Sequence, residues 1–97
     1  MEQLTYRQFI DGLNEGRIIK AVFQVENYNH YRYCTIERKK GYSDFYFDLF
    51  LTKDKSEHMI FCTKFGENHR IFDFGRKGKY TLEYLWNRIK FIEIVYA

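Results

Sequence analysis

The chain has 97 residues, of which 45% are hydrophobic and 21% aromatic, and its formal net charge is +3. This length predicts a single compact domain over residues 1–97 that buries about 65% of its unfolded surface, enough for a core without metal or disulfide. The lack of proline excludes a proline-rich ligand segment. No apolar run approaches the length of a bilayer span, so we expect a soluble protein with no membrane partner.

Two features bear on the cellular compartment. Residues 1–4 carry neither a basic region nor an apolar segment, so we expect no secretory signal. Cys34 and Cys62 are too few for a disulfide framework, and reduced, buried thiols are the simpler interpretation. We therefore expect a cytoplasmic protein without a cofactor.

The first predicted element is a helix that begins after Thr5. Thr5 and Gln8 form a capping box, and Gly16 fits the position that ends a helix. Gly12 inside the helix indicates close backbone packing. The apolar stripe at i, i+3, i+4 and i+7 consists of Tyr6, Phe9, Ile10 and Leu13.

Three strands joined by short turns are predicted next, over residues 18–25, 30–38 and 45–51. In the first, Ile19, Ala21, Phe23 and Val25 share one side. The third is the most aromatic, and one of its sides is wholly apolar, with Phe45, Phe47, Leu49 and Leu51. A central strand explains that side. The opposite side is amphipathic and carries Tyr46, Asp48, Phe50 and Thr52.

Residues 57–65 are open to two interpretations. Their alternation and residue types favour a strand, whereas Asp54 with Glu57 resembles a capping box and Gly66 a helix end. The strand is preferred. Residues 70–74 predict a further short strand, followed by a basic, flexible loop over residues 75–79.

A second helix is predicted after Thr81, which suits an N-cap. Its apolar stripe consists of Leu82, Leu85, Trp86 and Ile89, which places Trp86 in the core. Residues 91–96 are apolar on both sides except at Glu93, a pattern that suits an interior strand of the sheet.

These elements predict an α+β domain with the order α-β-β-β-β-β-α-β, in which two amphipathic helices cover one face of an antiparallel sheet of about five strands. The other face would be uncovered. By alternation it would carry Tyr31, Tyr33, Tyr46 and Phe50. An open aromatic patch is a sign of a binding surface; alternatively, the sheet curls and covers this face with its own loops.

Basic residues gather in two parts of the chain. The turn before the aromatic strand carries Arg38, Lys39 and Lys40. The stretch from residue 70 to residue 90 has only Asp73 and Glu83 as acidic residues and carries Arg70, Arg76, Lys77, Lys79, Arg88 and Lys90. If the two clusters converge, they form the basic face expected for a phosphate backbone or an acidic protein. Alternatively, both are solvated turns.

Residues 40–47 partly resemble the RNA-binding strand of RRM domains. Lys40, Gly41, Tyr42 and Phe47 match its pattern, but Asp44 stands where a base-stacking aromatic is expected. RRM domains also begin with a strand, whereas this chain begins with a helix. The general principle that remains is that aromatic rings beside cations hold single-stranded nucleic acid.

His30 with Cys34, and His58 with Cys62, share the spacing i, i+4 that ligates zinc from a helix. In a strand these positions lie about 13 Å apart, so the sequence predicts no metal site unless residues 57–65 are helical. Ser43 and Ser56 lack a nucleophile-elbow context. No catalytic arrangement is evident, and we expect no enzyme.

The sequence therefore predicts a non-enzymatic binding module with a protein partner, because Tyr and Arg are favoured at protein interfaces. Small domains of this kind are common among accessory and inhibitor proteins of phages and mobile elements. The alternative is a single-stranded nucleic-acid binder that stacks bases on Tyr31, Tyr33 and Tyr46 and binds phosphates with Lys39, Lys40, Arg76, Lys77 and Lys79. A homodimer through the aromatic face is a third possibility.

Overall fold

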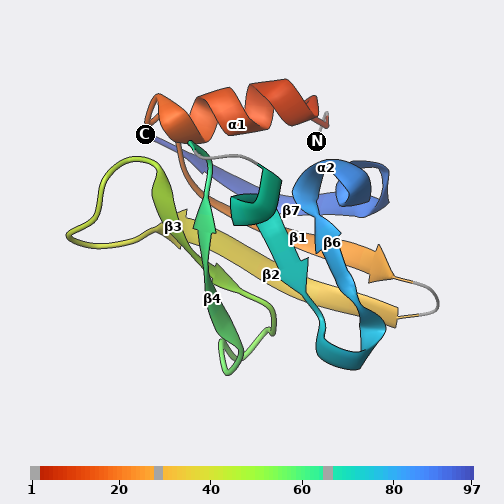
Figure 1. Ribbon diagram of the computed structural model, residues 1–97. Coiled ribbons are helices and arrows are strands. Elements are labelled where there is room, and N and C mark those ends of the chain that lie inside the picture. Colours follow the sequence, from red (N-terminus) through yellow and green to blue (C-terminus); the bar gives the residue numbers. More distant parts are fainter. Residues whose placement is uncertain (1–2, 28–29, 65–66) are drawn as a thin grey trace.

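A computed structural model describes residues 3–27, 30–64 and 67–97, which fold around a five-stranded antiparallel sheet (Figure 1). Its strands are β1 (Ile18–Asn27), β2 (His30–Arg38), β3 (Tyr46–Phe50), β4 (His58–Cys62) and β7 (Ile89–Tyr96). Their order across the sheet is β4-β3-β2-β1-β7. Tyr28 and Asn29 of the first predicted turn, and Phe65 and Gly66 after β4, lie outside the described residues.

The other elements are short and pack on one face of this sheet. They are the helices α1 (Tyr6–Asn14) and α2 (Leu82–Leu85), the strands β5 (Ile71–Asp73) and β6 (Lys79–Thr81), and the 3-10 turns η1 (Glu67–Arg70), η2 (Gly75–Lys77) and η3 (Trp86–Arg88). The radius of gyration is 12.3 Å, close to the value of about 12.5 Å expected for one compact domain of this length. An α+β domain with a five-stranded antiparallel sheet and two short helices is what the sequence predicts in outline.

Helix α1 forms as its sequence predicts. The Thr5 side chain accepts the Gln8 N–H, and the Gln8 side chain accepts the Thr5 N–H, so the capping box is complete. Gly16 has a φ of +74°, which lets the chain leave the helix without a Cβ penalty. The buried apolar residues of this helix are Phe9, Ile10 and Leu13.

The core lies between one face of the sheet and these short elements. Phe23 of β1 is at its centre, with its ring 5.7 Å from that of Phe91 in β7 and 6.0 Å from that of Phe72 in β5. Phe9 of α1 packs 5.2 Å from Phe91. The predicted apolar side of the third strand also points here, because Phe47 and Leu49 are buried. The covered face is thus set by the odd-numbered residues of β1 and β3.

The segment 70–79 departs from the prediction. Residues 71–73 were expected in the main sheet and residues 75–79 in a loop, but β5 pairs with β6 in a separate two-stranded hairpin. The turn between them is tight because Gly75 and Gly78 adopt φ of +65° and +101°. Phe72 then packs into the core, with its ring 6.1 Å from that of Phe61 of β4 and nearly perpendicular to it. The hairpin therefore covers the sheet instead of extending it.

The C-terminal part differs in two ways. Thr81 caps α2 by accepting the Tyr84 N–H, as predicted, but α2 ends at Leu85, continues as a 3-10 turn, and Ile89 already belongs to β7. Strand β7 is also an edge strand, not an interior one. Strand β7 has a bulge at Ile92, opposite Val22 and Phe23. Because of this bulge, the apolar residues of β7 lie on both sides of the sheet, and Ile92 is 45% exposed.

Two further expectations need adjustment. At the start of β1 it is Ile18 that is buried, whereas Ile19 is 40% exposed, because the register with β7 shifts between Ile18 and Lys20. Trp86 is half-buried at the margin of the core, with its ring 5.6 Å from Tyr6 and from Phe9.

Residues 58–62 form a strand, which decides the ambiguity at 57–65 for the described residues.

Candidate functional site

The second face of the five-stranded sheet is uncovered in the sense that no described helix or strand packs on it, although Tyr42 and Lys55 from the loops contact Tyr46 and Phe50. Cross-strand register assigns residues to this face, because paired residues in an antiparallel sheet point to the same side. Gln24 pairs with Tyr33, and Glu26 with Tyr31. Further along, the face carries Thr35, Glu37, Tyr46, Asp48, Phe50, His58, Ile60, Lys90 and Glu93. The prediction that Tyr31, Tyr33, Tyr46 and Phe50 share one uncovered face thus matches the register.

The two tyrosines of β2 are the most prominent rings of this face. Tyr31 is 62% exposed and Tyr33 39% exposed, whereas Tyr46 and Phe50 are half-buried. A hollow of about 280 Å³ beside them is lined by Tyr31, Arg32, Tyr33, Leu51, Thr52 and Lys53. A smaller hollow of about 100 Å³ on the other side of Tyr31 is lined by Gln24, Glu26, Tyr31, Arg88 and Lys90. Tyr31 therefore stands between two depressions of the surface, and we call this region the Tyr31–Tyr33 site.

Lysine ammonium groups lie over aromatic rings along this side of the protein. Lys53 Nζ is 5.2 Å from the centroid of Tyr33, and Lys55 Nζ is 4.9 Å from that of Phe50. Such contacts contribute about 0.5–1 kcal/mol when exposed. Both lysines come from the turn after β3, so this turn places positive charge beside the rings of Tyr33 and Phe50.

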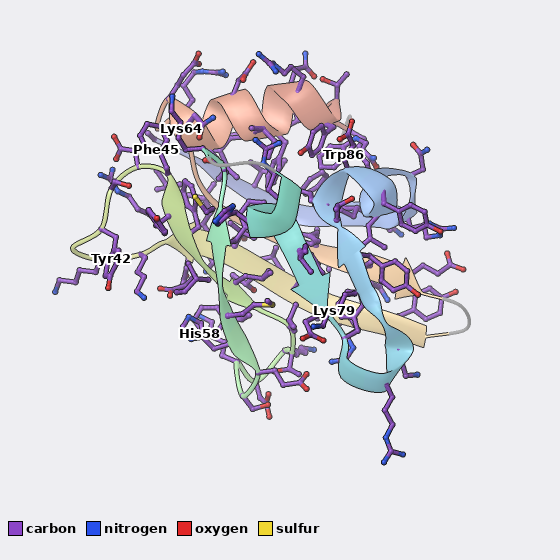
Figure 2. All side chains as sticks on the ribbon, viewed as in Figure 1. Tyr42, Phe45, His58, Lys64, Lys79 and Trp86 are labelled. Carbon is purple, nitrogen blue, oxygen red and sulfur yellow. The ribbon has the colours of Figure 1, made fainter. Side chains whose placement is uncertain are left out.

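The middle of the uncovered face carries negative charge. Glu37 and Asp48 are direct cross-strand neighbours, and like charges in this arrangement repel. Each carboxylate has a partner: Lys55 Nζ lies 3.5 Å from Glu37, and His58 Nε2 lies 2.7 Å from Asp48. Figure 2 shows His58 on β4, beside this part of the sheet. Carboxylates at this position oppose the binding of a phosphate backbone across the face.

The two predicted basic clusters do not converge. Arg32 of β2 lies 5.4 Å from the ring of Phe74, the residue before η2, which carries part of the second cluster. Arg38 of the first cluster follows Arg32 by six residues on β2, and six residues of an extended strand span about 20 Å. Figure 2 shows this separation, with Tyr42 beside the first cluster and Lys79 in the second. The sequence could not decide this point, because it depends on how the β5–β6 hairpin docks.

Several of the predicted cations also have local partners. Arg38 forms an ion pair with Asp44, and Lys79 Nζ lies 3.9 Å from Asp73. Lys39 Nζ lies 4.3 Å from the ring of Tyr42, which itself lies 5.9 Å from Tyr46. Arg76 and Lys40 are exposed, and Lys77 is half-buried. Of the predicted set, the structure thus brings together Lys39 and Tyr46 at one end of the face and Tyr31 and Tyr33 at the other.

Three further cations line the Tyr31–Tyr33 site. Lys53 comes from the turn after β3 and lines the larger hollow, whereas Arg88 of η3 and Lys90 of β7 line the smaller hollow on the other side of Tyr31. Arg88 and Lys90 belong to the second basic cluster predicted from the sequence. Lys53 was missed, because no local sequence signal marks it.

The cysteines occupy different faces of the sheet. Cys34 pairs with Phe23 on the covered face, and Cys62 pairs with Tyr46 on the other, where it is nevertheless buried. Burial raises the pKa of the Cys34 thiol to about 12, which the Arg32 charge only partly offsets. A thiol held in its protonated form is a poor nucleophile and metal ligand.

Within the described residues, no three or more His, Cys, Asp or Glu side chains gather where they could hold a metal ion. In that part of the chain there is also no helix with the length and apolar character needed to cross a bilayer. Compared with known proteins, the chain matches no protein-family model, no characterised protein and no solved structure. Its function is therefore inferred from the chemistry of the uncovered face.

Proposed function

We propose that this protein is a non-enzymatic protein-binding module whose contact surface is the uncovered face of the sheet, centred on the Tyr31–Tyr33 site. The observation that carries the proposal is that Tyr31, 62% exposed, stands between two hollows on a face that no described element covers. A large ring beside depressions suits the anchor of a protein interface, where Tyr and Arg contribute most. In this role the protein acts by occupying a surface of its partner, as accessory and inhibitor proteins do.

The charge pattern favours a protein over a nucleic acid. The face interleaves Glu26, Glu37, Asp48 and Glu93 with Lys20, Lys90 and the lysines of the adjoining turns. Mixed charges give specificity for a complementary protein surface, whereas a nucleic acid requires a continuous positive path. The separation of the two basic loops removes the main support for the phosphate-binding alternative.

Affinity capture with paired variants tests the proposal. Wild-type protein, a Tyr31→Ala/Tyr33→Ala variant and a Tyr96→Ala variant are each immobilised and exposed to a cell extract of the source organism. Tyr96 is a matched control, because it is 55% exposed but lies at the far end of β7, opposite Ile18. We expect a protein retained by wild type and by Tyr96→Ala to be lost from the double variant. Equal capture by all three would contradict the proposal.

The nucleic-acid alternative is tested separately, by fluorescence anisotropy with labelled single-stranded and duplex oligonucleotides at low and high salt. Phosphate binding weakens steeply with salt, with a logarithmic slope of roughly −0.7 per contact on single strands. We expect no tight binding at low salt. Tight, salt-sensitive binding that is lost on charge reversal at Lys53 and Lys90 would replace the protein-binding proposal.

A further inference from the structure

The backbone of β2 has an unpaired edge at the Tyr31–Tyr33 site. On one side β2 pairs with β1 from His30 to Glu37. On the other side its pairing with β3 begins only at Thr35, opposite Phe50. Among the described strands, residues 31–34 therefore have a neighbour on one side alone.

Strand β3 stops there because the chain turns back at once. Leu51 N–H donates to the Glu57 carbonyl at 2.9 Å, and the Thr52 hydroxyl accepts the N–H groups of Ser56 and Glu57 at 3.0 and 3.2 Å. Lys55 takes a left-handed conformation with φ of 61° inside this turn. The tight β3–β4 turn leaves the hollow of about 280 Å³ between residues 51–53 and the edge of β2.

The hydrogen bonds between β2 and β3 show which way the unpaired backbone groups of β2 point. Lys39 N–H donates to the Tyr46 carbonyl of β3 at 3.4 Å. Because the N–H and C=O groups of a strand alternate sides with each residue, those of Tyr33 and Tyr31 also point toward the β3 side. There they meet the hollow and not another strand. Two residues thus present N–H and C=O groups in the arrangement that accepts a further strand.

We infer that this edge binds an extended, acidic peptide segment of a partner protein, which adds to β2 beside residues 31–34. The inference rests on the proposed function and specifies its mode. Strand addition draws affinity from main-chain hydrogen bonds and specificity from flanking side chains. The cations that line the hollow beside this edge are Lys53 and Arg32, and Arg32 is paired with Glu57 at 2.6 Å. None of the described residues that line this hollow is an Asp or Glu, so the charge beside the edge is complementary to an acidic segment.

The terminal strands of the five-stranded sheet are β4 and β7, and the edge of β7 contrasts with that of β2. Strand β7 carries the bulge at Ile92, and a bulged edge pairs poorly with a further strand. The β1–β2 register, by contrast, runs from Lys20–Glu37 to Asn27–His30 without a shift. The edge of β2 is therefore a better template than that of β7.

Amide hydrogen exchange of the free protein is the first test. We expect the amides of Tyr31 and Tyr33 to exchange at least about 10-fold faster than those of Arg32 and Cys34, which point toward β1. Equal protection of all four amides would show that the edge is already covered and would overturn the inference.

Selection from a phage-displayed library of random octapeptides is the second test. We expect enriched peptides to be acidic and rich in β-branched residues, and to slow exchange at Tyr31 and Tyr33 when bound. Enrichment of basic peptides, or binding that leaves those amides unchanged, would overturn the inference. So would a single-stranded oligonucleotide that protects them while no peptide does.

A pair of substitutions separates the backbone edge from the rings. Tyr33→Pro removes an N–H that takes no part in the β1–β2 ladder, whereas Tyr33→Val removes the same ring and keeps the N–H. Far-UV circular dichroism and the urea midpoint check that both fold. We expect the selected peptide to bind Tyr33→Pro about 3- to 10-fold more weakly than Tyr33→Val. Equal weakening of both would leave the proposed function intact and refute strand addition; no weakening in either would refute both.

Discussion

Ile18 packs so closely on Gly12 that a methyl group at the glycine would lie 2.6 Å from Ile18 Cδ1 and 2.9 Å from Cγ1. Gly12 is in the middle of α1, and Ile18 is the buried first residue of β1. This contact fixes the distance between the helix and the sheet. It explains why a poor helix former occupies a helix interior.

Gly12→Ala should therefore destabilise the protein despite its better helix propensity. The propensity gain is about 1 kcal/mol, and overpacking of a filled site costs about 1–3 kcal/mol, so we expect a net loss of about 1 kcal/mol in the free energy of urea unfolding. Ile18→Val removes the clashing Cδ1 and should cost less in the Gly12→Ala background than in wild type. A stabilised Gly12→Ala variant would contradict the packing.

The contact between Arg70 and Tyr6 predicts a second loss of stability. Arg70 Nη1 donates to the Tyr6 hydroxyl and Nη2 to the Thr63 carbonyl, both at 2.7 Å, which ties α1 to the segments before β5 and after β4. Tyr6→Phe leaves a partly buried guanidinium N–H without its acceptor and should cost about 1–3 kcal/mol. Tyr84→Phe, at an exposed ring, should change urea unfolding by less than about 0.5 kcal/mol. Similar values for the two would show that the contact contributes nothing.

The docking of the β5–β6 hairpin on the sheet should depend mainly on Phe72. It is fully buried between Phe23 and Phe61. Phe72→Ala should cost about 3–5 kcal/mol, a large part of the stability of a small domain. Phe50→Ala, at a half-buried ring of the uncovered face, should cost clearly less. Urea unfolding followed by the fluorescence of the single tryptophan, Trp86, compares them, and a Phe72→Ala loss no larger than that of Phe50→Ala would refute the docking.

Cys34 should be unreactive and should make stability depend on pH. Burial raises its pKa from 9.0 to about 12, so the folded state favours the protonated thiol. That contribution is complete below pH 9 and is lost as the pH rises from 9 toward 12. In a Cys62→Ser background, we expect reaction with Ellman's reagent at pH 8 to be no faster than unfolding. Wild type should also lose more stability than Cys34→Ala between pH 9 and 11, and rapid labelling of the native protein would refute the burial.

Local patterns in the sequence were sufficient for much of the fold. The capping box of Thr5 and Gln8, the stripe through Phe9 and Leu13, and the N-cap of Thr81 involve residues only a few positions apart. Strand alternation likewise placed Tyr31 and Tyr33 on the side opposite the core, because side chains of a strand alternate with period 2.

The tertiary structure alone determined which segments of the chain are neighbours. Strand β5 left the main sheet because Phe72 could be buried by packing on the sheet's face, and this docking separated the two basic loops. The edge of β2 is open because the turn at Thr52 ends β3 early, and the same turn brings Lys53 to that edge. Arg88 and Lys90 line the hollow on the other side of Tyr31 because η3 and β7 become neighbours of β1 and β2. The sequence determined the elements and the side of each that is apolar, through short-range capping and periodicity. Strand order, hairpin docking and the open edge follow from long-range packing, whose energy depends on the whole core.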